Sequence, residues 1–301
     1  MTHHAGTAGR RWAVCVFAYN EERGITACLD SVLSAGAAGS TRVYVVANGC
    51  SDGTEALVEG YAKSHPQVTL VPLRLGDKSN AWNVFVHEVA PEADVCFFVD
   101  GDVRVCEGAF ERLAAALEAS PGANAAAAVP ARGRSKAWQE ALVCEHHLIL
   151  GNLYALRGEF VARARDGHVR FPIGYIGDDG LITSLAKWNL DPQGPFLEER
   201  VAPCPEAKFT FSSLSYRSLR DWKLYFRRGV RYSHRHFQHE MLVPILREFG
   251  VQGMPRSVDD LYLARSEQLA SFSPRSGLDA IFDRIALKRM KALVALEGVS
   301  G

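Results

Sequence analysis

Hydrophobic positions in the first hundred residues alternate between two spacings. Short uninterrupted apolar runs are followed by segments whose apolar residues recur every three or four positions. The first spacing is typical of strands buried on both faces, and the second of amphipathic helices. The runs predict strands at Trp12–Ala18, Val43–Ala47, Val68–Leu73 and Asp94–Val99. The other segments predict helices over Ile25–Leu33, around Leu57, Val58 and Tyr61, and over Asn80–Val89. Asp52 and Glu55 form a predicted capping box at the start of the second of these helices.

This alternation indicates βαβ units, so we expect an α/β fold with a mainly parallel sheet covered by helices on both faces. The second half has a looser pattern. It predicts helices at Phe110–Ala119, Trp138–Leu150 and Leu181–Trp188, a strand at Ala125–Pro130 and an extended segment at Asn152–Leu156. Beyond about residue 215, aromatic residues and arginines gather in Tyr216–Phe237, and two amphipathic helical stretches follow.

Composition excludes some classes of function. The chain has 301 residues, 48% of them hydrophobic, which suits one large α/β domain with an appendage or two modest domains. Lys+Arg and Asp+Glu both number 34, so no basic excess indicates a nucleic-acid partner. No apolar run reaches the roughly 18–20 residues that span a bilayer, and we expect no transmembrane segment.

The seven cysteines are an odd number, widely scattered, and show no metal-ligand spacing. This usage favours a reducing compartment without structural disulfides, so we expect a cytoplasmic protein. Residues 1–10 lack the apolar core of a signal peptide and are predicted to be a disordered tail.

Polar residues gather where the predicted strands end. In a parallel sheet, ligands bind at the carboxyl ends of the strands, so these segments are the first candidates for a site. They are Ala18-Tyr19-Asn20-Glu21-Glu22, Ala47-Asn48-Gly49-Cys50-Ser51-Asp52-Gly53-Thr54, Gly76-Asp77-Lys78-Ser79-Asn80-Ala81-Trp82-Asn83 and Asp100-Gly101-Asp102.

Asp100-Gly101-Asp102 carries the clearest chemistry. Two carboxylates one residue apart, directly after an apolar strand, need a counter-cation, and a hard divalent ion can serve while also binding a diphosphate. The alternative is a plain turn, because Asp and Gly are common turn residues. The position behind the apolar run Val95–Val99 favours the metal site.

These four segments, in this order and spacing, resemble the signatures of glycosyltransferase family 2, inverting nucleotide-sugar transferases with the GT-A fold. The resemblance covers about the first 105 residues well, continues more loosely to about residue 190 and then fades. It implies a GT-A catalytic domain at 11–215, with a nucleotide-sugar-binding half at 11–105 and an acceptor half at 106–215. Residues 216–301 would form a mainly helical C-terminal region.

The resemblance also assigns residues. It implies a nucleotide-diphosphate sugar as donor, most commonly a UDP-sugar, and Mg²⁺ or Mn²⁺ held by Asp102 with Asp100. Many relatives carry Asp where this chain has Ala47, which leaves the nucleotide base open. The implied donor contacts are Ala18, Tyr19, Asn20, Glu22, Asn48, Asp52, Lys78, Asn80, Asp100, Gly101 and Asp102.

A second acidic pair, Asp178 and Asp179, precedes the helix predicted at Leu181–Trp188. From the residues alone, the pair is better explained as a helix N-cap, where Asp is favoured. The family places a Glu-Asp pair at this point, and its Asp is the general base. The resemblance therefore implies that Asp179 accepts the proton of the attacking acceptor hydroxyl, with Asp178 beside it.

The C-terminal region leaves several alternatives open. Arg227, Arg228 and Arg231 loosely resemble the signature of processive relatives. The full pattern Gln-x-x-Arg-Trp is absent, which disfavours polymer synthesis. The alternative is that these arginines form a solvated face of a helix. His234 or His236 would be a third metal ligand or a structural residue. The amphipathic segment Leu278–Leu296 would dock on the catalytic domain or on a twin subunit, or lie peripherally on the inner face of a membrane near a lipid-linked acceptor.

Two other functions compete with sugar transfer to a glycan, lipid-linked or small-molecule hydroxyl. A sugar nucleotidyltransferase usually has a Gly-rich basic loop after its first strand, and the acidic loop Tyr19–Glu22 disfavours it. A nucleotide-sugar sensor without turnover is disfavoured by the two intact acidic pairs. No GxGxxG opens the first helix, which argues against a nicotinamide-dependent enzyme.

Overall fold

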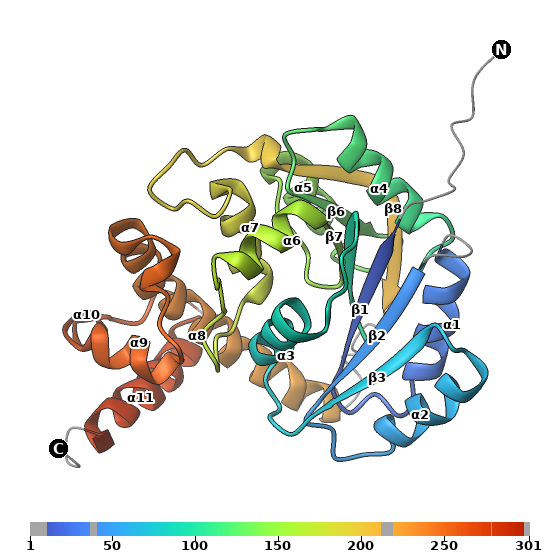
Figure 1. The fold of residues 1–301 in the computed structure, drawn as a ribbon. Coiled ribbons are helices and arrows are strands. Elements are labelled where there is room, and N and C mark those ends of the chain that lie inside the picture. Colours follow the sequence, from blue (N-terminus) through green and yellow to red (C-terminus); the bar gives the residue numbers. More distant parts are fainter. Residues whose placement is uncertain (1–10, 37–40, 212–218, 278, 298–301) are drawn as a thin grey trace.

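The computed structural model describes residues 11–36, 41–211, 219–277 and 279–297, and these contain one eight-stranded sheet (Figure 1). The strand order is β3-β2-β1-β4-β7-β6-β8-β5. The strands are β1 (Trp12–Ala18), β2 (Thr41–Asn48), β3 (Val68–Leu73), β4 (Val95–Asp100), β5 (Val103–Val105), β6 (Ala125–Pro130), β7 (Leu153–Arg157) and β8 (Val201–Phe211). The predicted tail at 1–10 lies outside the described residues.

The parallel half of the sheet consists of β3, β2, β1 and β4, as the alternating pattern predicts. All seven residues of β1 are buried, because β1 lies between two strands and helices cover the sheet on both sides. Helices α1 (Ile25–Ala35) and α2 (Thr54–Ser64) lie on one side of these strands, and α3 (Lys78–Val84) lies on the other (Figure 1). A π-helical turn, Phe85–Val89, extends α3.

The other half of the sheet is mixed. β7 is antiparallel to both β4 and β6, β8 is parallel to β6, and β5 is antiparallel to β8. Neither β5 nor β8 is predicted by the sequence pattern. β8 contains Pro203 and Pro205, which are unusual inside a sheet, and its pairing with β6 has a register shift between Ala128 and Val129.

Most predicted helices form, with changes at their ends. The remaining helices of this half are α4 (Ala109–Ala119), α5 (Lys136–His146), α6 (Gly158–Asp166) and α7 (Asp178–Trp188). The helix predicted to reach Leu150 ends at His146, because His147 adopts a left-handed conformation. The capping-box prediction is wrong: the N-cap of α2 is Gly53, and no side-chain cap bond forms there.

The C-terminal region is helical, with α8 (Leu219–Phe249), α9 (Val258–Ala264), α10 (Ser266–Ser271) and α11 (Asp279–Glu297). α11 packs on α8: its residues Ala286, Leu287 and Met290 are buried, and the Phe282 ring contacts Phe226. The amphipathic last segment, for which docking on the catalytic domain, docking on a twin subunit and a membrane surface were the alternatives, thus packs along one face on a helix of the C-terminal region. None of the described helices has the length and apolar character needed to cross a membrane.

Candidate active site

The carboxyl ends of β1, β2 and β4 meet at one edge of the sheet, so the predicted motifs come together there. The Gly101 amide donates to the Phe17 carbonyl oxygen at 2.8 Å. A Cβ at residue 101 would lie 3.0 Å from that oxygen and 3.2 Å from the Ala18 Cα. Glycine therefore allows the turn after β4 to pack directly on the end of β1.

The loops after β1 and β2 are tied together by side-chain contacts. The Asn20 Oδ1 accepts from the Ser51 amide at 2.8 Å, and the Glu22 Oε2 accepts from the Gly53 amide at 3.0 Å. Asp52 accepts from the Glu22 amide at 3.2 Å and from the Thr54 amide at 3.0 Å. These predicted donor contacts thus serve first to fix the shape of the two loops, while Tyr19 leaves 57% of its surface exposed beside them.

Asn48 connects the end of β2 to the start of α3. Its buried side chain accepts from the Asp77 amide at 2.8 Å, and Asp77 caps α3 by accepting from the Asn80 amide at 2.7 Å. Asp77 also accepts from the Gly174 amide at 2.9 Å. The loop before α3 is therefore fixed to the segment that leads into α7.

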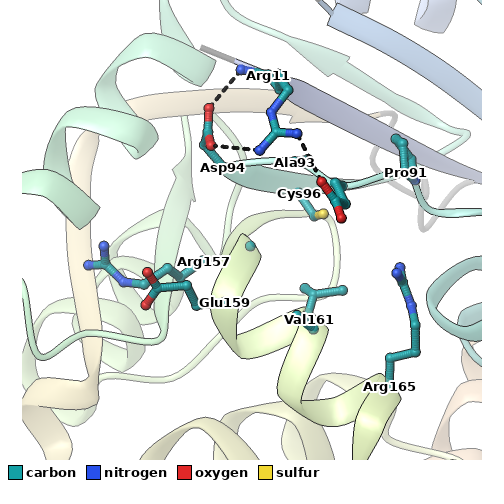
Figure 2. A pocket seen from close by; sticks show the side chains of 12 residues that line it. Arg11, Pro91, Ala93, Asp94, Cys96, Arg157, Glu159, Val161 and Arg165 are labelled. Carbon is teal, nitrogen blue, oxygen red and sulfur yellow. Dashed lines mark hydrogen bonds and ion pairs between the residues drawn. The ribbon is translucent and has the colours of Figure 1, made fainter.

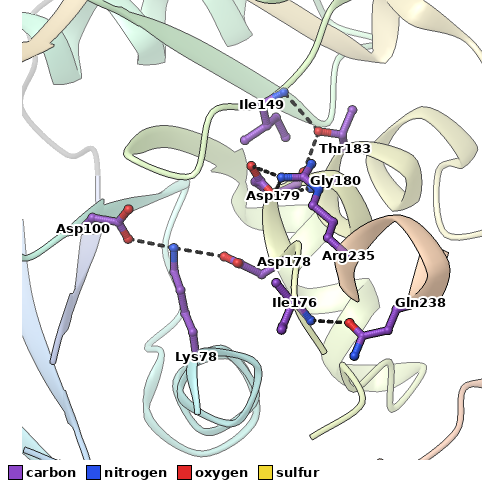
Figure 3. Close-up of polar contacts among 10 residues, drawn as sticks. All are labelled: Lys78, Asp100, Ile149, Ile176, Asp178, Asp179, Gly180, Thr183, Arg235 and Gln238. Carbon is purple, nitrogen blue, oxygen red and sulfur yellow. Dashed lines mark hydrogen bonds and ion pairs between the residues drawn. The ribbon is translucent and has the colours of Figure 1, made fainter. Parts of the chain in front are cut away.

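Lys78, the first residue of α3, joins the two acidic pairs (Figure 3). Its Nζ lies 2.7 Å from Oδ1 of Asp100 and 3.0 Å from Oδ2 of Asp178. These carboxylates raise the pKa of Lys78 well above its usual value, despite the opposing effect of burial. Lys78 is therefore a fixed cation between the end of β4 and the start of α7, next to the Phe17 ring and the buried Tyr154.

Negative charge gathers at this edge beyond what Lys78 offsets. Burial, followed by Asp102 and Asp100, raises the pKa of Glu21 to about 7. Burial also raises the pKa of Asp100 to about 6, against the lowering effect of Lys78. Glu21, which is not among the donor contacts implied by the family resemblance, thus belongs to the same group of acids. Asp102, the other acid of this group, is exposed to solvent.

This donor set fits a hard divalent cation, because it offers carboxylate oxygens whose mutual repulsion a cation would relieve. Within the described residues, no three His, Cys, Asp or Glu side chains are arranged to hold a metal ion by themselves. Of the two histidines considered as further ligands, His234 lies near Arg289 of α11, and the His236 ring packs against Phe237.

Asp179 lies in the first turn of α7 and faces α8. The N-cap of α7 is Gly177, and neither Asp178 nor Asp179 takes the capping role that the sequence left open. Nη1 of Arg235, on α8, lies 2.9 Å from Oδ1 and 3.1 Å from Oδ2 of Asp179 (Figure 3). Asp179 Oδ1 also accepts from the Gly180 amide at 2.8 Å. The contact with Arg235 was not predicted from the sequence.

The backbone around Asp179 is anchored as well. The Asp179 carbonyl accepts from the Thr183 hydroxyl at 2.7 Å, and that hydroxyl accepts from the Ile149 amide at 3.0 Å. On the other side, the Ile176 amide donates to Gln238 of α8 at 2.8 Å, and Gln238 donates to Tyr262 at 2.7 Å. The Asp179 carboxylate is therefore held in a fixed direction.

A cavity of about 450 Å³ lies elsewhere, lined by Arg11, Glu92, Asp94 and Arg157 among others (Figure 2). Arg11 precedes β1 and Asp94 precedes β4, so this cavity lies at the amino ends of the parallel strands. The ion pair between Arg11 and Glu92 there is exposed, with 58% and 84% of the side chains accessible. The motifs lie at the opposite ends of the same strands, and we assign the site to them.

Comparison with known proteins identifies similar chains. A family model described as Glycosyl transferase family 2 matches residues 13–166. The structure resembles a mannosyltransferase, PcManGT from Pyrobaculum calidifontis in complex with GDP-Man and Mn²⁺, at 19% identity and a TM-score of 0.58, over 97% of this chain and 88% of that one.

It also resembles TarS 1–349 from S. aureus in complex with UDP-GlcNAc, at 14% identity and a TM-score of 0.52, over 95% of this chain and 92% of that one. At these identities, the likeness establishes the fold that the sequence predicts. A comparison with curated proteins found no match.

Proposed function

Since this chain belongs to glycosyl transferase family 2, we propose that it transfers a sugar from a nucleotide-diphosphate sugar to an acceptor hydroxyl, with inversion. One observation carries the proposal. Lys78 joins Asp100, at the end of β4, to Asp178, the residue before the candidate base. An acid expected to face the donor diphosphate and the neighbour of the acid expected to activate the acceptor therefore lie on either side of one fixed cation.

On the donor side, the loops fixed by Asn20, Glu22, Asn48 and Asp52 would hold the nucleoside, as the family resemblance implies. Asp102 and Asp100 would hold Mg²⁺ or Mn²⁺, which when bound would neutralise the negative charge of the diphosphate. The two similar structures were solved with GDP-Man and with UDP-GlcNAc, which supports a nucleotide sugar as donor. We propose UDP as the nucleotide, as the family resemblance implies.

On the acceptor side, Asp179 would act as the general base. A hydroxyl that attacks the anomeric carbon must lose its proton, and a carboxylate within hydrogen-bond reach can take it. Arg235 and the Gly180 amide hold the Asp179 carboxylate, so its direction is set before the acceptor arrives. In a single displacement, the acceptor oxygen would form a bond to the anomeric carbon as the bond from that carbon to the diphosphate breaks. The nucleoside diphosphate would leave, and the configuration of the sugar would be inverted. The free thiols of the cysteines fit the cytoplasmic location that we propose.

The test is a thermal-shift panel of UDP- and GDP-sugars, each measured with Mn²⁺, with Mg²⁺ and with EDTA. A donor at about 100 times its Kd should stabilise the fold by about 2.7 kcal/mol, and only when the metal is present. Asp102→Ala should lose the metal-dependent shift. Glu92→Ala, which removes an exposed acid at the other end of the strands, should keep it.

A metal-dependent shift that survives in Asp102→Ala would place the cation elsewhere. If no nucleotide sugar stabilises the wild-type protein in the presence of either metal, the proposed donor class is wrong.

A further inference from the structure

One face of α8 carries a row of arginines. Arg227, Arg231 and Arg235 follow one another at intervals of four residues, and Arg228 lies beside them. At about 100° per residue, the four lie within an arc of about 100° on the helix. Arg227, Arg228 and Arg231 are exposed, and none of them makes an ion pair or hydrogen bond with another residue that the structure describes. We call these four residues the arginine row.

The arginine row ends at the candidate base. Arg235 is its last member, and its guanidinium contacts Asp179. The Arg235 side chain comes this close because glycines stand at the N-cap of α7 and in its first turn. A Cβ at residue 177 would lie 2.8 Å from the Arg235 Cγ, and a Cβ at residue 180 would lie 2.9 Å from its Nη2. Arg227 lies eight residues before Arg235, so the row extends along α8 for roughly 12 Å from the residue that contacts Asp179.

A second segment brings positive charge to the other end of the row. The loop between β6 and α5 carries Arg132 and Arg134, both exposed, and Nη2 of Arg134 donates to the Tyr225 hydroxyl at 3.2 Å. Tyr225 precedes Arg228 by three residues, about one helical turn. Two elements far apart in the sequence therefore place cations on the same side of the acceptor half.

Within α8, no acid offsets the charge of the arginine row. The chain as a whole has 34 basic and 34 acidic residues, yet α8 has no Asp or Glu between Tyr225 and His239. Arginine is suited to phosphate because its guanidinium offers a planar pair of donors. A row of such groups with its last member at the candidate base suits an acceptor whose phosphates lie beyond its reactive hydroxyl.

We propose, on the basis of the proposed function, that the acceptor carries phosphate groups and lies along the arginine row with its hydroxyl at Asp179. The phosphates bind Arg227, Arg228 and Arg231 and bring the hydroxyl to the base. The phosphate belongs either to a soluble phosphorylated acceptor or to the headgroup of a lipid-linked one. Arg227, Arg228 and Arg231 then determine which acceptors the enzyme selects.

The experiment compares two triple variants that remove the same number of charges. Arg227→Gln/Arg228→Gln/Arg231→Gln removes charge from the arginine row. Arg284→Gln/Lys288→Gln/Arg289→Gln removes it from the exposed face of α11. Binding of inorganic tripolyphosphate is measured by calorimetry in EDTA, so that a metal at Asp102 does not contribute. We expect the Kd to rise at least tenfold in the α8 variant and to change less than about twofold in the α11 variant.

Sedimentation with phosphatidylglycerol and phosphatidylcholine vesicles distinguishes the two sources of phosphate. Loss of phosphatidylglycerol binding in the α8 variant alone indicates a lipid headgroup. Tripolyphosphate binding without vesicle binding indicates a soluble acceptor. If both triple variants weaken phosphate binding equally, the effect comes from net charge alone and the proposal is wrong. The proposal is also wrong if the α8 variant binds tripolyphosphate and the vesicles as tightly as the wild type does.

Donor binding to the same proteins is measured separately with Mn²⁺. If the wild-type protein binds no nucleotide sugar, the proposed function fails, whatever the phosphate result. If it binds a donor but the arginine row does not bind phosphate, only the acceptor assignment fails.

Discussion

At the scale of single residues, the central feature of the candidate site is a lysine that offsets the negative charge of two acids. Asp100 and Asp178 would repel each other strongly without Lys78, and the lysine would be costly to bury without them. All three residues are expected in the site, because each stands in a motif that resembles glycosyltransferase family 2; for Asp178 the sequence pattern alone favours a helix N-cap. The sequence did not predict that they contact one another, since no spacing along the chain encodes a pair formed by α3 and α7. Arg235 was missed for the same reason.

The residue with the sharpest predicted effect is Asp179. In Asp179→Asn, the amide has nearly the same shape but cannot accept a proton from the acceptor hydroxyl. Turnover should therefore fall about a hundredfold or more, a typical contribution of a general base. Donor binding should persist, because the strand-end loops are unchanged. Steady-state rates, together with the metal-dependent thermal shift, measure both quantities on the same preparation.

The matched control for this variant is Asp166→Asn, which neutralises an exposed acid at the end of α6. It should retain both rate and donor binding. Near-normal turnover in Asp179→Asn would assign the base to another residue.

At the scale of elements, a helix or strand is predicted correctly where its own residues carry the pattern, and missed where contacts distant in sequence form it. The bounds of β1, β3 and β6 are those predicted. β1 and β6 are short apolar runs whose residues are all buried, whereas β3 is an edge strand in which only Val68 is buried. β8 was missed because Pro203, Pro205, Glu206 and Lys208 interrupt any such run. Its place in the sheet comes from pairing with β6 and β5, which are distant in sequence.

The start of α7, which carries Asp179, also depends on a contact distant in sequence. The pattern predicted this helix from Leu181, whereas it begins at Asp178 after Gly177, whose φ is +113°. Glycine is required there twice, because other residues rarely adopt that conformation and because the Arg235 side chain fills the space of a Cβ. The position of Asp179 therefore depends on a residue without a side chain.

Gly177→Ala should consequently affect both stability and activity. The strained backbone should cost about 1–3 kcal/mol in the free energy of unfolding, and the new methyl group should push Arg235 away from Asp179. Urea unfolding and turnover measure the two effects. Gly122→Ala is the control, because nothing lies within 4 Å of a Cβ at that position. If Gly177→Ala matches the control in both measurements, the close packing of α8 on α7 does not position the base.

At the scale of the whole molecule, α8 connects the part of the fold that carries the candidate site to the C-terminal helices. It contacts Asp179 through Arg235 on one face, and it packs against α11 on another. The sequence predicted a helical C-terminal region and an amphipathic last helix, but periodicity alone does not identify the surface that such a helix covers. Phe282 and the buried residues of α11 identify it as α8. The outer face of α11 remains exposed at Ile281 and Leu293.

The attachment of α11 includes one buried charge, Asp283, whose side chain is fully covered. Asp283 accepts from the Arg275 amide at 2.8 Å and from the Arg275 side chain at 2.9 Å and 2.8 Å. These contacts, chiefly those with the Arg275 guanidinium, hold the pKa of Asp283 well below its usual value. A carboxyl whose pKa is lower in the folded state stabilises the fold above its unfolded pKa of about 4, and that contribution is lost as the pH falls further.

Asp283→Asn should therefore lower the free energy of unfolding by about 1.5–3 kcal/mol at neutral pH, the typical worth of hydrogen bonds to a charged group. The difference from the wild type should shrink as the pH falls below about 4, because the wild-type carboxylate then becomes protonated on unfolding. Asp279→Asn is the control: its carboxylate lies 3.8 Å from Arg275 and is 60% exposed, so the effect should stay within about 1 kcal/mol. Urea unfolding at about pH 7 and pH 3 measures both variants. A difference that stays constant with pH would mean that Asp283 stabilises the attachment of α11 by its shape and not by its charge.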